Sequence, residues 1–214
     1  MWLFKDRRDA GQQLASLVEE KVSGENVIIL GLPRGGVQVA LEVAKALGCP
    51  LDVFLVRKLG VPGQEELAMG AVASGGIRVL NKQVIEALNI DESTIEETTL
   101  REMEELERRA KVYRGDVPPP DLKGKTVVLV DDGIATGASM KAVIEALKQR
   151  GPERIVVAVP LASEDSLYIL GKEADEIICI ETPEPFYGVG VWYDSFPQNT
   201  DTEVCNWLKE IDYR

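Results

Sequence analysis

Hydrophobic and polar positions form two recurring patterns along this chain. Runs of consecutive apolar residues are typical of strands buried on both faces of a parallel sheet, and they occur at residues 26–30, 51–56, 126–130, 154–160 and 176–180. Apolar residues that recur every three or four positions are typical of amphipathic helices, and they occur at residues 7–22, 37–47, 163–172, 201–211 and from about 140 to the capping Gly151. This alternation predicts a three-layer α/β fold, with helices flanking a central, mostly parallel sheet of about five strands joined by right-handed crossovers.

The most informative stretch is residues 126–139. Its buried strand is followed by two carboxylates, Asp131 and Asp132, then by a loop of small residues and the start of a helix. Ligands of open α/β sheets bind beyond the carboxyl ends of the strands, where loop N–H groups and a helix N-terminus can hold a phosphate. The carboxylates can accept hydrogen bonds from a pair of hydroxyls. We interpret the stretch as a site for a ribose 5-phosphate; the alternative is a polar strand end with an ordinary Asp turn.

A second glycine-rich loop, residues 31–36, follows the first predicted strand. Its backbone N–H groups can hold another anion, and Arg34 would add charge-assisted hydrogen bonds. The loop lacks the G-x-G-x-x-G spacing of a dinucleotide site. The strand 51–56 leads into Arg57 and Lys58, which at the carboxyl end of a parallel strand would point toward the same crevice. The alternatives are an ordinary turn with an exposed arginine and a solvated basic pair.

Three segments between these units have distinct patterns. Residues 60–66 are polar and contain Gly and Pro, as in a loop. Residues 71–74 and 77–80 flank two consecutive glycines and predict a hairpin. Residues 91–114 predict one long, charged helix, packed through a single apolar stripe on the surface or at a subunit interface.

The sequence Val-Leu-Val-Asp-Asp-Gly-Ile-Ala-Thr-Gly-Ala-Ser at 128–139 resembles the phosphoribosyl pyrophosphate (PRPP) motif of type I phosphoribosyltransferases. Together with the Pro-Arg-Gly-Gly loop, the Val-Arg-Lys strand end and the Thr-Pro-Glu-Pro-Phe-Tyr tail, it is similar to a group of bacterial and archaeal members without an assigned acceptor. The resemblance implies one domain over 1–214, with a core at about 24–180, a helical insertion at about 82–116 and a hood. The hood would comprise residues of about 181–200 and the N-terminal segment, and residues 60–66 would be a flexible loop that closes over the reaction.

The same resemblance implies a Mg²⁺-dependent transfer of the 5-phosphoribosyl group of PRPP to a nitrogenous acceptor such as a nucleobase, with release of pyrophosphate. Asp131 and Asp132 would bind the ribose hydroxyls and hold Mg²⁺ indirectly, through PRPP and water. Arg34 and Lys58 would act with them as catalytic residues at the pyrophosphate. The remaining substrate-binding residues would be Gly35, Gly36, Arg57, Gly133, Ala135, Thr136, Gly137, Ala138, Ser139, Phe186, Trp192 and Asp194.

The acceptor is restricted by one departure from the family pattern. Hypoxanthine and guanine enzymes carry an Asp where this chain has Ala135, whereas adenine and orotate enzymes carry a small residue there, so a 6-oxopurine acceptor is disfavoured. In the aromatic tail, Phe186 or Trp192 could stack on a flat base and Asp194 could meet metal or pyrophosphate. The alternative is that the aromatic rings only pack the hood.

Composition narrows the class of protein further. The net charge of −12 over 214 residues argues against nucleic acid or an anionic membrane as the main partner. The chain has no His, its three Cys form no C-x-x-C pair, and no apolar run is long enough for a signal peptide or a membrane span. We therefore expect a cytoplasmic protein, and a homodimer. Two other functions stay open: a non-catalytic sensor of PRPP or nucleotides with the same fold, and a nucleotide-sugar or ribose-phosphate hydrolase.

Overall fold

A five-stranded parallel sheet forms the centre of the molecule, with the strand order β2-β1-β6-β7-β8. The computed structural model describes residues 2–22, 24 and 26–211, and at positions 65 and 66 it describes the backbone alone. The strands are β1 (Val27–Gly31), β2 (Leu51–Val53), β6 (Thr126–Val130), β7 (Arg154–Leu161) and β8 (Glu176–Glu181). The predicted fold class is therefore confirmed.

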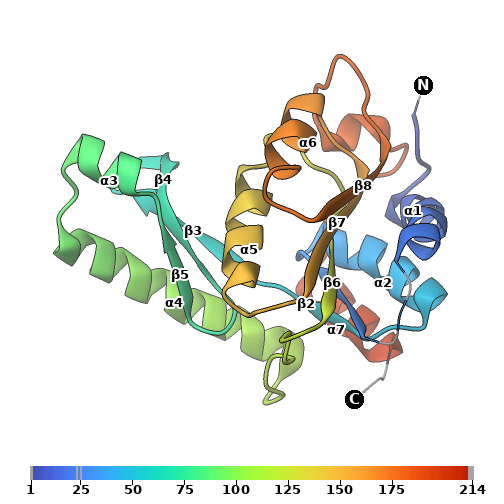
Figure 1. Cartoon of the computed structure of the whole chain (residues 1–214), viewed down its shortest axis with the longest axis horizontal. Coiled ribbons are helices and arrows are strands. Elements are labelled where there is room, and N and C mark those ends of the chain that lie inside the picture. Colours follow the sequence, from blue (N-terminus) through green and yellow to red (C-terminus); the bar gives the residue numbers. More distant parts are fainter. Residues whose placement is uncertain (1, 23, 25, 212–214) are drawn as a thin grey trace.

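Helices cover both faces of this sheet (Figure 1). They are α1 (Arg7–Lys21) and α2 (Gly35–Leu47) on one face, α5 (Ala138–Lys148) and α6 (Glu164–Leu170) on the other, and α7 (Asp201–Glu210), which contacts α2. Alternate residues of each strand point to opposite faces. Ile29 and Val128 pack with α1 and α2, whereas Ile28 and Leu129 pack with α5. Both faces are buried, which explains why the strands are apolar at consecutive positions.

A second, antiparallel sheet extends from the core as an arm, which we define as residues 56–114 (Figure 1). Its elements are β3 (Val56–Val61), β4 (Gln64–Ala73), β5 (Ile77–Leu80), α3 (Lys82–Leu88) and α4 (Glu92–Arg114). Leu59 and Met69 of the sheet share an apolar cluster with Ile95 and Leu106 of α4. The long charged helix and the hairpin at Gly75-Gly76 are confirmed, since Ala73 pairs with Ile77 across that turn.

The prediction of one strand over residues 51–56 was wrong. Strand β2 ends at Val53, and the chain then leaves the parallel sheet because the N–H of Leu55 bonds to Ser74 Oγ at 3.0 Å. Arg57 and Lys58 consequently lie inside β3, opposite Val72 and Ala71 of β4. They do not mark the carboxyl end of a parallel strand.

Residues 60–66 also differ from the prediction of a loop. Gly60 and Val61 complete β3, Gln64 begins β4, and only a tight turn at Pro62 and Gly63 separates the two strands. Helix α3 was missing from the sequence interpretation, because its seven residues bury no side chain and so carry no clear periodic pattern.

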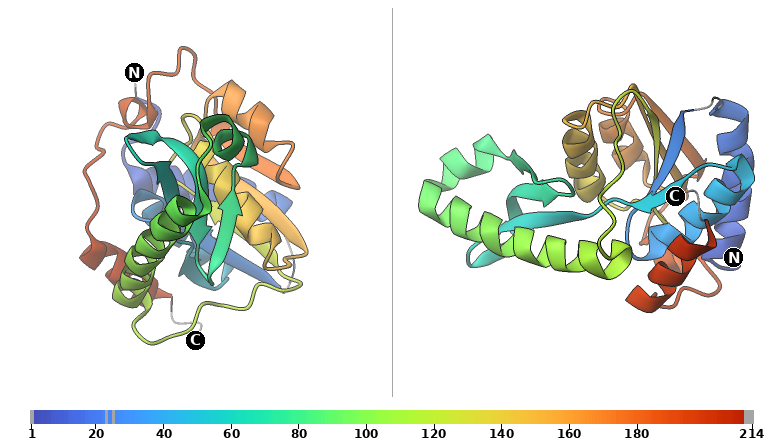
Figure 2. Two further views of the ribbon diagram at one scale, coloured as in Figure 1. Left: turned by 90° about the vertical axis from the view of Figure 1, so that its left-hand side faces the viewer. Right: turned by 90° about the horizontal axis from the view of Figure 1, so that it is seen from below.

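The N-terminal segment and the tail before α7 meet in a hood, which we define as residues 2–6 and 182–197. The N–H groups of Leu3 and Phe4 donate to the Trp192 carbonyl oxygen at 2.9 and 3.1 Å, and the N–H of Asp194 donates to the Phe4 carbonyl oxygen at 2.9 Å. Phe4 and Tyr193 are buried at its centre. Figure 2 shows the tail running along the side of the core on its way to α7. The hood therefore combines the tail and the N-terminal segment, as predicted.

Candidate functional site

The acid pair, Asp131 and Asp132, directly follows the last residue of β6. The N–H of Asp132 donates to Asp131 Oδ1 at 2.9 Å, and Arg7 Nε donates to Asp132 Oδ2 at 2.7 Å. Within the described part of the chain, the second oxygen of each carboxylate accepts no hydrogen bond. One acceptor oxygen on each carboxylate is thus left for two adjacent hydroxyls of a ligand.

The environment of the acid pair raises the pKa of both carboxyl groups. Burial raises the pKa of Asp131 well above its ordinary value, and repulsion from the neighbouring Asp132 adds to that rise. Burial also raises the pKa of Asp132, whereas the charge and hydrogen bond of Arg7 oppose the rise. Arg7 is a cation whose charge opposes this rise at both carboxyl groups.

The Pro-Arg-Gly-Gly loop packs directly against the acid pair. Helix α2 begins at Gly35, two residues earlier than predicted, and a Cβ on Gly35 would lie 2.0 Å from Asp132 Oδ2. A Cβ on Gly36 would lie 2.8 Å from Asp131 Oδ1. The two glycines are required because no side chain fits between the start of α2 and the carboxylates.

Arg34 is the exposed residue that precedes α2. The Pro33–Arg34 peptide bond is cis. Burial and the hydrogen bond to Asp201 raise the pKa of Tyr113 in α4, and the nearby charge of Arg34 partly offsets that rise. The positive charge of Arg34 thus acts on Tyr113, near the C-terminal end of α4.

The small-residue loop from Gly133 to Ser139 connects β6 with α5. Gly137 has φ 72°, a left-handed conformation that favours glycine. The carbonyl oxygen of Ala135 accepts hydrogen bonds from Ser163 Oγ and Ser166 Oγ, both at 2.7 Å. The loop is thereby anchored to the start of α6. Its other predicted ligands are exposed to solvent: Thr136, Ala138 and Ser139.

The two helices that follow the glycine loops share an unusual feature. Neither α2 nor α5 has a side-chain hydrogen bond at its N-cap. The other α-helices of the described chain are all capped by a side chain at Asp6, Asn81, Asp91, Ser163 or Thr200. Uncapped N-termini leave backbone N–H groups available, and the helix dipole favours an anion there.

Arg57 and Lys58 lie on the arm rather than with the acid pair. Arg57 Nε donates to Glu102 Oε2 of α4 at 2.8 Å. Lys58 is exposed on β3. The role of these two residues at a pyrophosphate stays a prediction, and it would require the arm to contribute to the site.

The predicted residues of the tail are spread over the hood. Phe186 and Trp192 pack against its apolar cluster, and Trp192 Nε1 is buried with no hydrogen-bond partner in the described structure. Asp194 is exposed, and its N–H donates to the Phe4 carbonyl oxygen. The packing of the aromatic rings is thus visible, whereas stacking on a base stays a prediction.

Sequence reasoning missed two residues that contact the acid pair. Arg7 bonds to Asp132 across 125 positions of sequence, and the hydroxyl of Tyr193 donates to the carbonyl oxygen of Asp132 at 2.6 Å. No local spacing connects these residues with residues 128–139. The basic N-terminal segment and the aromatic tail were the available signals, and neither specifies a partner.

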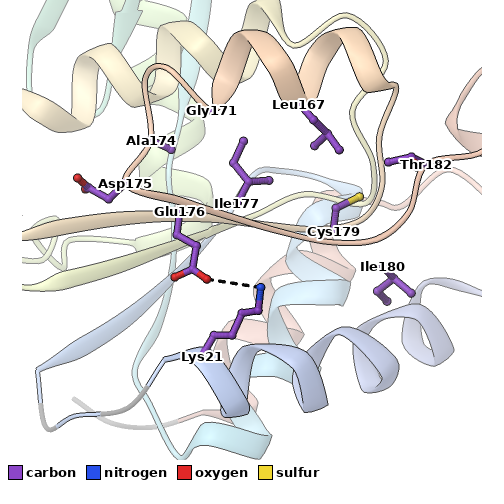
Figure 3. A pocket seen from close by; sticks show the side chains of 10 residues that line it. All are labelled: Lys21, Leu167, Gly171, Ala174, Asp175, Glu176, Ile177, Cys179, Ile180 and Thr182. Atoms are coloured by element: carbon purple, nitrogen blue, oxygen red, sulfur yellow. Dashed lines mark ion pairs between the residues drawn. The ribbon is translucent and has the colours of Figure 1, made fainter.

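Several surface cavities lie outside the acid pair. The cavity in Figure 3, of about 540 Å³, lies at the open edge of β8 beside the Lys21–Glu176 ion pair, and none of the predicted site residues lines it. A second cavity, of about 550 Å³, lies between β4, β5 and the start of α5, where Ala138 contributes to the lining. Within the described residues, no three His, Cys, Asp or Glu side chains cluster as a metal site.

A parallel α/β sheet with an acid pair between two uncapped helix N-termini is an arrangement that can hold an anionic ligand beyond the carboxyl ends of the strands. The model of the phosphoribosyl transferase domain matches residues 5–194. The chain therefore belongs to the phosphoribosyl transferase family, as the motifs of the sequence predict.

The chain is similar to several known proteins, one of which is named as a phosphoribosyl transferase. A Mycobacterium tuberculosis protein, whose name assigns it provisionally as a phosphoribosyl transferase, is 46% identical over 208 residues, which are 97% of this chain and 47% of that protein. A crystal structure of a Thermus thermophilus protein is 45% identical, has a TM-score of 0.87 and covers 97% of this chain and 98% of its own. The bifunctional protein PyrR of Chloroflexus aurantiacus is 35% identical over 129 residues, 59% of this chain and 65% of its own.

Two further facts concern the length of the mycobacterial relative and the helices of this chain. The chain spans about half the length of the mycobacterial relative. Across the part of the chain that the structure describes, no helix has the length and apolar character needed to cross a membrane.

Proposed function

We propose that this protein is a Mg²⁺-dependent phosphoribosyl transferase that moves the 5-phosphoribosyl group of PRPP to a nitrogenous acceptor, most simply a nucleobase. The bond from C1 to the pyrophosphate oxygen breaks, pyrophosphate leaves with the electron pair, and the acceptor nitrogen forms the new bond to C1. The proton that the acceptor loses passes to solvent. Such a step depends on positioning and charge stabilisation and needs no strong protein base. It is therefore compatible with a chain that contains no His.

One observation carries the proposal. The acid pair lies between the only α-helix N-termini in the described structure that lack a side-chain cap, with Gly35 and Gly36 packed on its carboxylates. PRPP carries a vicinal diol between two anionic groups, so its parts match this order of acceptors and N–H groups. In this proposal the loop from Gly133 to Ser139 holds the 5-phosphate, and residues 34–36 hold pyrophosphate.

Mg²⁺ fits the chemistry of the acid pair. The ion prefers phosphate oxygens, water and one or two carboxylates, and each carboxylate of the acid pair retains one oxygen outside its internal hydrogen bonds. Asp131 and Asp132 would hold the ion through water and PRPP. When bound, the ion would offset the charge of the leaving pyrophosphate.

The acceptor site is assigned to the hood. Phe186 or Trp192 would contact the base, and Asp194 would meet metal or pyrophosphate. Ala135 brings no carboxylate to the acceptor, which supports an acceptor other than a 6-oxopurine. We further propose a cytoplasmic homodimer with no nucleic-acid partner, in line with the net charge of −12.

Pyrophosphate release separates the candidate functions. The purified chain is mixed with PRPP, MgCl₂ and a panel of nucleobases and related nitrogen heterocycles, and pyrophosphate and PRPP are both quantified. A transferase releases pyrophosphate only with a suitable acceptor, and it forms the matching nucleotide. Loss of PRPP without an acceptor would indicate a hydrolase, and binding without turnover across the panel would indicate a sensor; either result contradicts the proposed transfer.

A further inference from the structure

Arg7 lies at the junction of three parts of the chain. It is the first residue of α1, it is 6% exposed, and its Nε donates to Asp132 Oδ2 at 2.7 Å. Its Nη1 donates to the carbonyl oxygen of Pro197 at 2.7 Å, and its guanidinium lies 3.6 Å from the centre of the Phe196 ring. A single side chain thus joins α1, the acid pair and the hood.

The contacts of Arg7 are directional as well as ionic. A guanidinium has N–H donors in a fixed plane, so bonds to Asp132 and Pro197 together fix its orientation. The hydroxyl of Tyr193 holds the backbone of Asp132 from the same side, and Tyr193 stacks on Phe196 with ring centres 4.8 Å apart. The carboxylate of Asp132 is therefore held by Arg7 of α1, and its backbone is held by Tyr193 of the hood.

The other charged and titratable groups around Arg7 do not replace it. Asp131 and Tyr193 face the same ion pair, and neither carries a positive charge. Glu203 of α7, whose pKa is lowered chiefly by hydrogen bonds from Thr200, also feels the charge of Arg7. Removing the guanidinium would leave these acidic groups without the cation that faces them.

We infer that Arg7 is a positioning residue for the diol site: it fixes the Asp132 carboxylate by using one oxygen, leaves the other for the substrate, and couples this carboxylate to the hood. The inference rests on the proposed function, because the diol belongs to the proposed PRPP. Asp132 would then be held in place by Arg7, which also donates to the carbonyl oxygen of Pro197 in the hood.

Arg114 provides a matched control for Arg7. Its Nε donates to Asp52 Oδ1 at 2.9 Å, and the side chains of this pair are 6% and 18% exposed, against 7% and 17% for Arg7 and Asp132. Arg114 also donates to the carbonyl oxygen of Val53, as Arg7 does to that of Pro197. The two arginines are thus alike in burial and bonding, but Arg114 has no contact with the acid pair.

The test compares Arg7→Met, Arg7→Lys and Arg114→Met with the wild type. Thermal unfolding measures stability, calorimetry with Mg²⁺ and PRPP measures affinity from pH 5.5 to 8, and ¹³C NMR of the Asp carboxyl groups follows the acid pair without any ligand. Asp131→Asn and Asp132→Asn assign the signals. Both Met variants should unfold at lower temperature than the wild type, since each leaves a buried carboxylate unpaired.

Arg7→Met alone should alter the acid pair. Its carboxyl titration should move to higher pH by about one to three pH units, the range over which an adjacent cation lowers a carboxyl pKa, and PRPP affinity at neutral pH should fall by about tenfold or more. Arg7→Lys should restore the titration. Equal titrations and equal PRPP affinities in Arg7→Met and Arg114→Met would overturn the inference.

Two further measures cover the cases in which Arg7→Met does not fold or the wild type does not bind PRPP. If Arg7→Met does not fold, Arg7→Gln removes the charge while keeping an N–H donor, and the same two readouts apply. If the wild type binds no PRPP, the proposed function fails, but the ligand-free titration still decides whether Arg7 controls the acid pair.

Discussion

Gly35 and Gly36 show most directly why specific residues are needed at this site. The start of α2 approaches the acid pair so closely that a Cβ at either position would overlap a carboxylate or the strand end that carries it. The familiar explanation of a glycine loop, that it frees the backbone to approach an anion, is incomplete here. These glycines also let the helix approach the acid pair of its own chain.

Gly35→Ala should therefore destabilise the protein by about 2 kcal/mol, the usual range for overpacking. Its Cβ would lie 2.0 Å from Asp132 Oδ2 and 2.7 Å from Arg7 Nε, so the ion pair must move. Urea denaturation measures the loss. Gly124→Ala is the comparison, because Gly124 has φ 67° and no atom within 4 Å of its Cβ; its cost should be about 1 kcal/mol, from the left-handed backbone alone. Equal losses would show that the contact with Asp132 carries no strain.

We expect the buried acid pair to lower the free energy of unfolding near neutral pH, although the proposed function requires it for ligand binding. A carboxyl whose folded-state pKa lies above its unfolded value stabilises the folded state at low pH, and this contribution is lost as the pH rises through the folded-state pKa. Burial raises the folded-state pKa of Asp131 above its ordinary value. Its contribution to the free energy of unfolding should therefore fall as the pH rises above the ordinary carboxyl range near 3.8.

Asp131→Asn should remove that penalty, because an amide oxygen can still accept the hydrogen bond from the N–H of Asp132. We expect a gain on the order of 1 kcal/mol at pH 7, typical of relieving a functional site, together with a weaker dependence of stability on pH between 4 and 7. Thermal unfolding over a pH series measures both. A variant less stable than the wild type at pH 7 would show that the carboxylate contributes net stability.

Strands and helices of the central sheet were readable from the sequence because each carries its own pattern. The consecutive apolar residues of β6 are buried on both faces, and α5 repeats its apolar residues at helical spacing. The break after Val53 has no such signal, since Phe54, Leu55 and Val56 continue the apolar run while the chain changes sheets. Tertiary contacts, such as the hydrogen bond from the N–H of Leu55 to Ser74 Oγ, decide which sheet this segment joins.

In the candidate site, too, some residues could be predicted from the local sequence and others could not. Asp131, Asp132 and the loop after them are contiguous, so one motif reveals them together. Arg7 and Tyr193 approach the acid pair from the two ends of the chain, where only the fold brings them together. Uncapped helices are likewise visible only in the structure, since Arg34 and Gly137 differ little in sequence from ordinary loop residues.

Helix α3 should be the least stable helix of the arm. None of its seven residues is buried, whereas α4 buries Ile95, Leu106 and Tyr113. Local opening is easiest where few apolar contacts would be lost. Hydrogen exchange followed by mass spectrometry should show α3 amides exchanging at least about a hundredfold faster than those of β6. Similar protection in both segments would contradict this difference.

In the whole molecule, segments that are far apart in the sequence meet near the acid pair. The N-terminal segment pairs with the tail, and Tyr193 of this hood contacts the end of β6. Arg7 at the start of α1 bonds to both the acid pair and the hood. The arm extends from the opposite side of the core and carries Arg57 and Lys58 (Figure 1). The hood thus contacts the acid pair directly, whereas the contribution of the arm to PRPP binding stays a prediction.

Calorimetry with PRPP and MgCl₂ tests the central claim most directly, because it needs no knowledge of the acceptor. We predict saturable binding of one PRPP per chain by the wild type. The Asp131→Asn, Asp132→Asn double variant, checked for folding by circular dichroism, should show no measurable binding under the same conditions. Unchanged PRPP affinity in the folded double variant, or no binding by the wild type, would contradict the assignment of residues 128–139 as the PRPP site.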